Sequence, residues 1–111
     1  MARPPYSVEQ VINRGYSIIA RHPTYSQPNR GSTMNAAQYD CSSFMGTING
    51  VGVPATPSMV GVYTSYGYQH LKYSGMGALR KGDVLVWNKG GTSGSGNNGH
   101  TAMYIGNGQL M

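Results

Sequence analysis

The chain is poor in charged and aliphatic residues. Only 10% of its 111 residues are charged, and Leu, Ile, Val and Phe together number 18. An aliphatic content this low raises the question of disorder, but disordered chains are also rich in charge and poor in aromatic residues. Here nine Tyr, seven Met and one Trp are spread along the sequence. We therefore predict a small folded domain with a polar, tyrosine-lined interior.

Cysteine and long apolar runs are also scarce. The only cysteine, Cys41, excludes an internal disulfide and leaves a free thiol. No apolar run approaches the roughly 20 residues that span a bilayer, and the N-terminus lacks the apolar segment of a secretory signal. The 17 Gly and six Pro require many turns. These features exclude an all-helical bundle and predict a protein with neither a membrane span nor a signal peptide.

Acidic residues are few, since three Asp and Glu stand against eight Lys and Arg, for a net charge of +5. This balance favours polyanionic surroundings, which include nucleic acid, bacterial cell wall and an anionic membrane face. The basic residues are scattered, and only Arg80 and Lys81 are adjacent. No basic stripe alternates with stacking aromatic residues, so we expect no nucleic-acid partner.

The N-terminal half predicts helices. Ser7 and Gln10 form a capping box at the start of a first helix, which ends at His22-Pro23. Its apolar residues recur at helical spacing: Val8, Val11, Ile12, Tyr16 and Ile19. A long loop follows over residues 23–38. A second helix is predicted from Asp40, its N-cap, to the Asn49-Gly50 stop signal, and a third over residues 57–66 with Thr56 as its cap.

The C-terminal half predicts strands over residues 68–73, 84–87 and 100–105. The Gly106-Asn107-Gly108 turn then predicts a hairpin with residues 109–111. Between the last two strands, residues 88–99 are of low complexity, and we expect them to form a mobile wall of a cleft. Helices followed by strands indicate an α+β architecture, with N-terminal helices packed on an antiparallel sheet. We expect one domain over residues 1–111.

Cys41 lies in the first turn of the second predicted helix. A thiol reacts as its thiolate, which the partial positive charge of a helix N-terminus favours. The free N–H groups there also stabilise the oxyanion of an acyl-transfer reaction. The polar neighbours Asp40 and Ser42 suit an exposed nucleophile, whereas the alternative is a cysteine buried as a small apolar residue.

Three histidines are candidates for the base that such a thiol requires. His100 begins a strand after a glycine-rich segment, so its imidazole can face the start of a packed helix. For His22 and His70 the simpler interpretation is a surface histidine. A cysteine and a histidine distant in sequence are typical of a cysteine hydrolase. We expect no metal and no cofactor, because these residues lack the close spacing of zinc ligands.

Three segments resemble, in order, the signature blocks of the NlpC-type cysteine peptidases, papain-like enzymes that cut bacterial peptidoglycan. They are residues 39–44 (YDCSSF), 80–87 (RKGDVLVW) and 99–108 (GHTAMYIGNG). The resemblance runs from about Tyr25 to the end of the chain, and three ordered blocks are far more specific than one.

The resemblance implies a papain-like α+β core with Cys41 as the nucleophile and His100 as the general base. It also implies cleavage within the peptidoglycan stem peptide, typically after D-glutamate. Tyr25 stands where the family often has an active-site tyrosine. Asp40 and Ser42 flank the nucleophile in the family too, and we expect them to shape the site rather than to react.

The family's third catalytic residue lies on the strand after the Gly-Asn-Gly turn, and this chain ends at Met111 as that strand begins. Either the natural protein continues or the residue is missing; loss of such a residue weakens hydrolysis without abolishing it. We expect a chain that is truncated at its C-terminal end.

We therefore predict a stem-peptide endopeptidase that acts as a monomer in the bacterial cell wall. The expected source is a bacteriophage, with the protein released as a lysin or delivered with the virion. One alternative is an N-acetylmuramoyl-L-alanine amidase that uses the same Cys41 and His100. The other is a non-catalytic cell-wall-binding module, in which Cys41 is unreactive towards alkylating reagents.

Overall fold

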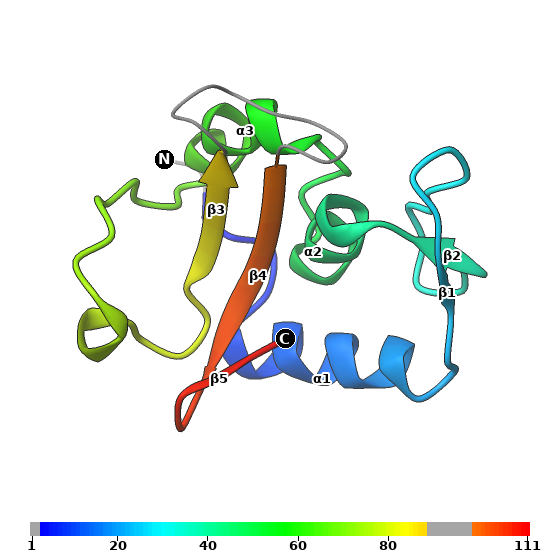
Figure 1. Cartoon of the computed structure of the whole chain (residues 1–111), viewed down its shortest axis with the longest axis horizontal. Coiled ribbons are helices and arrows are strands. Elements are labelled where there is room, and N and C mark those ends of the chain that lie inside the picture. Colours follow the sequence, from blue (N-terminus) through cyan, green and yellow to red (C-terminus); the bar gives the residue numbers. More distant parts are fainter. Residues whose placement is uncertain (1–2, 89–98) are drawn as a thin grey trace.

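The structure is a computed structural model that describes residues 3–88 and 99–111. Helices and a three-stranded antiparallel sheet pack together, which confirms the predicted α+β class (Figure 1). In chain order the elements are α1 (Val8–Ile19), β1 (Thr24–Tyr25), β2 (Gln38–Tyr39), α2 (Cys41–Asn49), the 3-10 turn η1 (Thr56–Ser58), α3 (Met59–Ser65), the 3-10 turn η2 (Met76–Ala78), β3 (Val84–Asn88), β4 (Gly99–Gly106) and β5 (Gln109–Leu110).

The sheet has the order β3-β4-β5. β3 and β4 are antiparallel, with Trp87 opposite His100, and β4 turns back into β5 through Asn107 and Gly108. Both turn residues have positive φ, 54° and 74°, as a two-residue hairpin turn requires. The strands predicted over residues 84–87 and 100–105 and the predicted hairpin are therefore confirmed.

α1 begins as predicted, because the Ser7 hydroxyl accepts from the Gln10 amide and the Gln10 side chain accepts from the Ser7 amide. Its predicted apolar face is only partly right. Of that set, Val8, Tyr16 and Ile19 are exposed. The residues that α1 buries are Val11, Ile12, Gly15 and Ile18. The helix is rotated relative to the prediction because α2 and the Met111 side chain pack on the Gly15 side.

α2 has the predicted boundaries. Asp40 caps its N-terminus, and Gly50 ends it in the left-handed conformation with φ 74°. In Figure 1, α2 lies between β4 on one side and the β1–β2 pair on the other, in agreement with its contacts to β4 and β2. Seven of its nine residues are buried. The helix is therefore held from both sides, and its first residue, Cys41, has a fixed position.

Three predictions for the middle of the chain are corrected. The loop over residues 23–38 is closed at its ends by the short parallel pair β1–β2. Thr56 is not a side-chain cap but the first residue of η1, and α3 starts only at Met59. Residues 68–73 form no strand. Instead, the Tyr68 hydroxyl donates a hydrogen bond of 2.8 Å to Asn49 Oδ1, which ties this segment to the end of α2.

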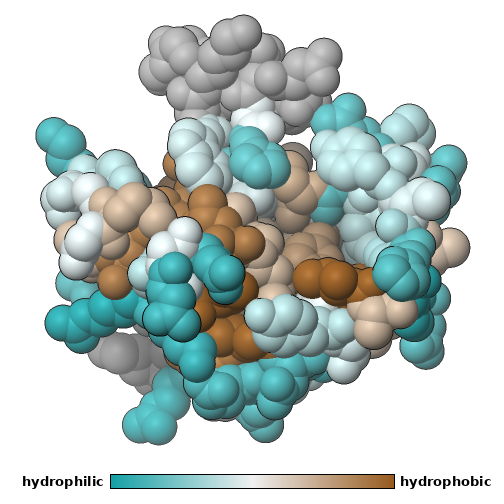
Figure 2. Space-filling view, turned by 60° about the horizontal axis from the view of Figure 1, so that its bottom comes forward, coloured by the Kyte–Doolittle hydropathy of each residue, from teal (hydrophilic) through white to brown (hydrophobic). Residues whose placement is uncertain are grey.

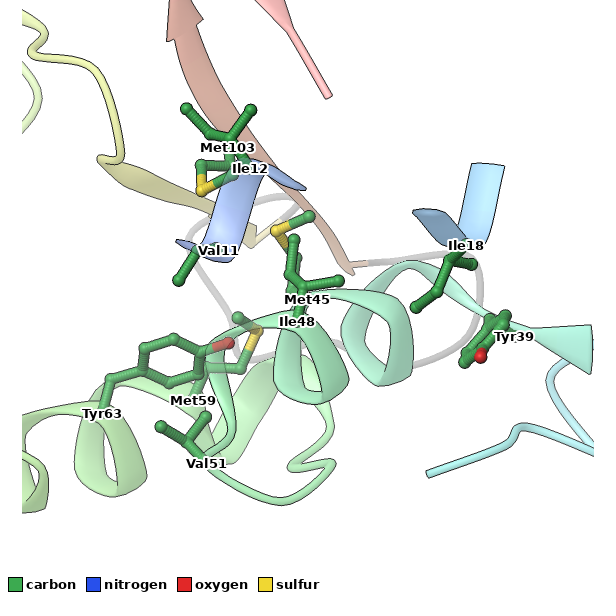
Figure 3. Packing of buried hydrophobic residues seen from close by; sticks show 10 residues of the cluster. All are labelled: Val11, Ile12, Ile18, Tyr39, Met45, Ile48, Val51, Met59, Tyr63 and Met103. Atoms are coloured by element: carbon green, nitrogen blue, oxygen red, sulfur yellow. The ribbon is translucent and has the colours of Figure 1, made fainter. Parts of the chain in front are cut away.

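One cluster of buried side chains joins α1, α2, α3 and β4 (Figure 3). It is mainly aliphatic and methionine, so the predicted tyrosine-lined interior is only partly right: of the nine tyrosines, only Tyr39 and Tyr63 are among its buried members. The full set is Val11, Ile12, Ile18, Tyr39, Met45, Ile48, Val51, Met59, Tyr63 and Met103.

The surface retains apolar side chains as well. Figure 2 shows them in the middle of one face, surrounded by hydrophilic residues. Within residues 3–88 and 99–111, no helix is long and apolar enough to cross a membrane. The wall predicted over residues 88–99 falls almost entirely on 89–98, outside the described residues.

Candidate active site

Cys41 is the first residue of α2 and is half-buried. Its side chain lies at a surface cavity of about 350 Å³. The cavity wall comes from four parts of the chain: the β1–β2 loop, the start of α2, the segment that enters η1, and the first residue of β4. Its lining residues are Gln27, Arg30, Asp40, Cys41, Ser42, Ala55, Thr56 and Gly99. The only thiol of the protein therefore opens onto a cavity rather than into the core.

The parallel pairing of β1 with β2 places Tyr25 near the start of α2. Tyr25 is paired with Tyr39, only two residues before Cys41. Burial raises the pKa of Tyr25 above its ordinary value, and the negative charges of Cys41 and Asp40 raise it further, against a side-chain hydrogen bond with Gln27. The Tyr25 side chain is nevertheless 66% exposed and is not among the residues that line the cavity, so it lies outside the cavity wall.

Asp40 is the centre of a hydrogen-bonded network at the start of α2. Its Oδ1 accepts from the Ser43 amide at 2.8 Å, and the Ser43 hydroxyl accepts from the Asp40 amide at 2.9 Å. Arg30 Nε lies 3.1 Å from Asp40 Oδ2. Burial by itself raises the pKa of Asp40, but the hydrogen bonds from Ser43 and Arg30 and the arginine charge outweigh it. The pKa of Asp40 therefore lies below its ordinary value.

Arg30 also contacts Ser42, the residue after Cys41. Its Nη2 donates to Ser42 Oγ at 2.8 Å, and Ser42 Oγ in turn lies 3.3 Å from Asp40 Oδ1. Asp40 and Ser42 are buried, with 9% and 4% of their surface exposed. Arg30, Asp40 and Ser42 thus form a closed triangle of contacts that includes both chain neighbours of Cys41.

The sequence did not single out Arg30. It is one of eight basic residues and lies in an irregular loop, ten residues before Asp40. The loop positions it through its neighbour Gly31, whose amide donates to the Gln38 carbonyl at 2.8 Å. A Cβ on Gly31 would overlap Ala36, so a glycine is needed for this close approach. A glycine after an arginine is the only local signal, and it is too common to be diagnostic.

The start of α2 offers donors for an anion. The Ser43 amide is bound to the Asp40 side chain and the Phe44 amide to the Asp40 carbonyl. The amides of Cys41 and Ser42 lie in the first turn, where a helix provides no carbonyl acceptor for them. Together with the positive end of the helix dipole, they form an environment that stabilises a thiolate or an oxyanion.

The imidazole of His100 is not part of this cavity wall. Its chain neighbour Gly99 lines the cavity, but the His100 side chain is exposed and packs against Trp87 on the adjacent strand. His22 and His70 are also exposed. Within the described residues, the structure therefore brings Asp40, Cys41 and Ser42 together in the cavity wall and leaves the side chains of Tyr25 and His100 outside it.

The comparison with protein-family models agrees with the expected substrate. Residues 8–111 match Amidase_5, whose description is bacteriophage peptidoglycan hydrolase. No curated protein matches the chain. The match confirms the expectation of a phage hydrolase that acts on peptidoglycan in the bacterial cell wall. Because the match covers nearly the whole sequence, the chain belongs to the bacteriophage peptidoglycan hydrolase family.

Proposed function

We propose that this peptidoglycan hydrolase is a cysteine endopeptidase of the NlpC type, with Cys41 as its nucleophile. The observation that supports the proposal is the position of the only thiol, at the N-terminus of α2 and at the wall of a 350 Å³ cavity. Pockets of this size hold small ligands or a short stretch of peptide. We further propose that the chain is one domain and acts as a monomer.

In the proposed reaction, His100 accepts the proton of the Cys41 thiol, and the thiolate attacks the scissile carbonyl carbon. Amides of the first turn of α2 stabilise the oxyanion of the tetrahedral intermediate. The protonated His100 then donates its proton to the leaving amine as the C–N bond breaks. Water, deprotonated by the same histidine, hydrolyses the thioester and regenerates the thiol.

His100 is the proposed base because the backbone of β4 leads to the cavity at Gly99. The imidazole is exposed and is one residue away from the wall, so rotation of its side chain is the movement that the reaction requires. Hydrogen bonds to a catalytic base are often long in the absence of substrate and tighten when substrate binds. Neither His22 nor His70 has a neighbour of this kind among the lining residues.

Two alternatives use the same cavity. An N-acetylmuramoyl-L-alanine amidase would break the bond between the glycan and the stem peptide with the same Cys41 and His100. A wall-binding module would hold peptidoglycan without cleaving it. The net charge of +5 suits a polyanionic wall in each case, so only the products separate these functions.

The decisive experiment is mass spectrometry of the products from purified peptidoglycan incubated with the protein or with Cys41→Ala. We expect fragments cut inside the stem peptide that are absent with Cys41→Ala. Release of intact stem peptides would identify an amidase instead. Unchanged cleavage by a folded Cys41→Ala variant would disprove the cysteine mechanism.

The role of His100 is tested with a matched pair of histidine variants. We expect His100→Ala to lower the cleavage rate by about 10²- to 10⁴-fold, the usual contribution of a general base. His70→Ala removes an exposed imidazole outside the cavity wall and should leave the rate unchanged. Equal rates for the two variants would exclude His100 as the base.

A further inference from the structure

We propose that Arg30 is a positioning residue of this site: by binding Asp40 and Ser42 together, it fixes the start of α2 and holds Cys41 at the cavity. The inference rests on the proposed function, because it concerns the same nucleophile. It assigns a role to a loop residue that lies eleven positions before the cysteine and does not react itself.

The contacts of Arg30 enclose the nucleophile on both sides along the chain. Arg30 Nε is 3.1 Å from Asp40, the residue before Cys41, and Nη2 is 2.8 Å from the hydroxyl of Ser42, the residue after it. The planar guanidinium presents several N–H donors in a rigid fork, so one arginine can reach two acceptors in fixed geometry. Cys41 therefore lies between two residues that are bound to one rigid group.

The side chains of Arg30 and Asp40 are both largely buried. Asp40 retains only 10% side-chain exposure and Arg30 26%. A charge this buried requires a partner, since loss of that partner leaves it uncompensated. Asp40 in turn caps α2 through the Ser43 amide. Without Arg30, the buried carboxylate of Asp40 would have to move towards water or take up a proton, and either change disturbs the cap that sets the direction of the first turn.

A small displacement at this point matters because the reaction depends on the direction of the thiol. A misplacement of about 1 Å in a reacting group can cost about 10²-fold in rate. We therefore expect loss of Arg30 to affect the chemical step more than the binding of substrate.

The first test compares Arg30→Gln with Arg21→Gln. Arg21 is a matched control, because it also anchors this loop, through the carbonyls of Met34 and Ala36 and the Tyr39 hydroxyl, without contact to Asp40 or Ser42. On a soluble muropeptide substrate, Arg30→Gln should lower kcat by about 10- to 100-fold and change KM by less than about twofold. Arg21→Gln should retain kcat. A raised KM with unchanged kcat would make Arg30 a substrate-binding residue and overturn the proposal.

The second test does not depend on hydrolysis. Because Cys41 is the only cysteine, its alkylation by iodoacetamide at neutral pH reports on this thiol alone. We expect Arg30→Gln to slow alkylation by about three- to tenfold, because a displaced Cys41 no longer holds its position at the N-terminus of α2, whereas Arg21→Gln leaves the rate unchanged. If Cys41→Ala still cleaves peptidoglycan, the proposed function fails, yet this alkylation test still judges the role of Arg30.

Arg30→Lys separates positioning from simple loss of fold. Lysine retains the charge for Asp40 and so retains the ion pair, but its single ammonium group does not reproduce the fork that binds Ser42 as well. We expect a folded variant, by circular dichroism, with kcat and alkylation rate between those of the unchanged protein and Arg30→Gln. Values within twofold of the unchanged protein for both Arg30 variants would overturn the proposal, as would equal losses in Arg21→Gln.

Discussion

The indole of Trp87 packs against the imidazole of His100, with their ring centroids 5.4 Å apart and their planes inclined by 33°. The two residues lie opposite each other in the β3–β4 pair, so the contact is set by the strand register. Trp87 is itself 44% exposed. The contact therefore holds the imidazole against β3, outside the cavity wall, and the rotation that the proposed reaction requires would have to break it.

Replacement of Trp87 tests this contact. We expect Trp87→Ala to raise the rate of peptidoglycan cleavage by up to about tenfold, because loss of a ring contact worth about 0.5–1.5 kcal/mol frees the imidazole to rotate towards Cys41. Trp87→Phe retains an aromatic face and should keep the rate of the unchanged protein. Turbidity loss of a cell-wall suspension measures both. A Trp87→Ala variant as fast as the unchanged protein would show that the ring contact has no part in the reaction.

Alanine substitutions at two helical glycines should have opposite effects on stability. A Cβ on Gly46 in α2 would overlap the Gly52 carbonyl oxygen, whereas one on Gly61 in α3 meets nothing within 4 Å. Gly46→Ala should therefore lower the free energy of unfolding by about 1–3 kcal/mol through overpacking. Gly61→Ala should raise it by up to about 1 kcal/mol, since alanine is the better helix former. Urea unfolding compares the two, and equal effects would contradict the packing of α2 against residues 52–53.

Because the pKa of Asp40 is lowered, we expect the stability of the protein to depend on pH in the acidic range. In the folded protein this carboxyl ionises below its ordinary value of 3.8, so the folded state binds fewer protons than the unfolded state in that range. The resulting stabilisation is fully present when the pH is above the ordinary pKa of the carboxyl. It is lost as the pH falls through the lower pKa that Asp40 has in the folded protein. We expect the free energy of unfolding to fall from about pH 5 towards pH 3.

Asp40→Asn is the matched variant for this titration. It retains an oxygen that can accept from the Ser43 amide but does not ionise. Its free energy of unfolding, from urea titrations at several pH values, should fall less steeply over the same interval. Identical slopes would show that Asp40 is not responsible.

Two tyrosines, the buried Tyr63 in α3 and the partly buried Tyr68 after it, lead us to expect a loss of stability at alkaline pH. Burial raises the pKa of Tyr68 from 10.0 to about 12, and burial raises the pKa of Tyr63 as well. The tyrosine hydroxyls therefore lose their protons more readily in the unfolded chain than in the folded protein. Their contribution to stability is complete below pH 10 and is lost as the pH rises through the raised pKa values of the folded protein. Tyr68→Phe should make the fall in unfolding free energy between about pH 10 and 12 less steep. Tyr73→Phe, at an exposed site, should leave the slope unchanged.

Local patterns predicted where α1 and α2 begin, although α1 ends at Ile19 rather than at the predicted His22-Pro23. Ser7 with Gln10, and Asp40 ahead of Cys41, act over three residues through one side chain and a nearby amide, so they depend little on the rest of the molecule. The Asn107-Gly108 turn is equally local, because both positions require positive φ. These signals were sufficient for the α+β class and for the position of the thiol at a helix N-terminus.

Predictions that depended on distant partners were less successful. The predicted strand over residues 68–73 has the composition of a strand, but Tyr68 is bound to Asn49 and its ring packs edge-on against Tyr63. The apolar face of α1 was misplaced for the same kind of reason: periodicity shows that a face exists, whereas the neighbours decide its exact direction. A weak local preference is overridden when tertiary contacts bury other side chains.

By itself, the sequence determined that Cys41 begins a capped helix, that a hairpin ends the described fold, and that three ordered segments resemble a peptidoglycan-cutting family. Only the tertiary structure decided which side chains surround the thiol. The pairing of two-residue strands sets Tyr25 beside Tyr39, two residues before Cys41, and Arg30 binds Asp40 and Ser42 from an irregular loop in which Gly31 is bound to Gln38. Such contacts join residues ten or more positions apart by packing and charge, and they have no periodicity or local motif that a sequence pattern would show.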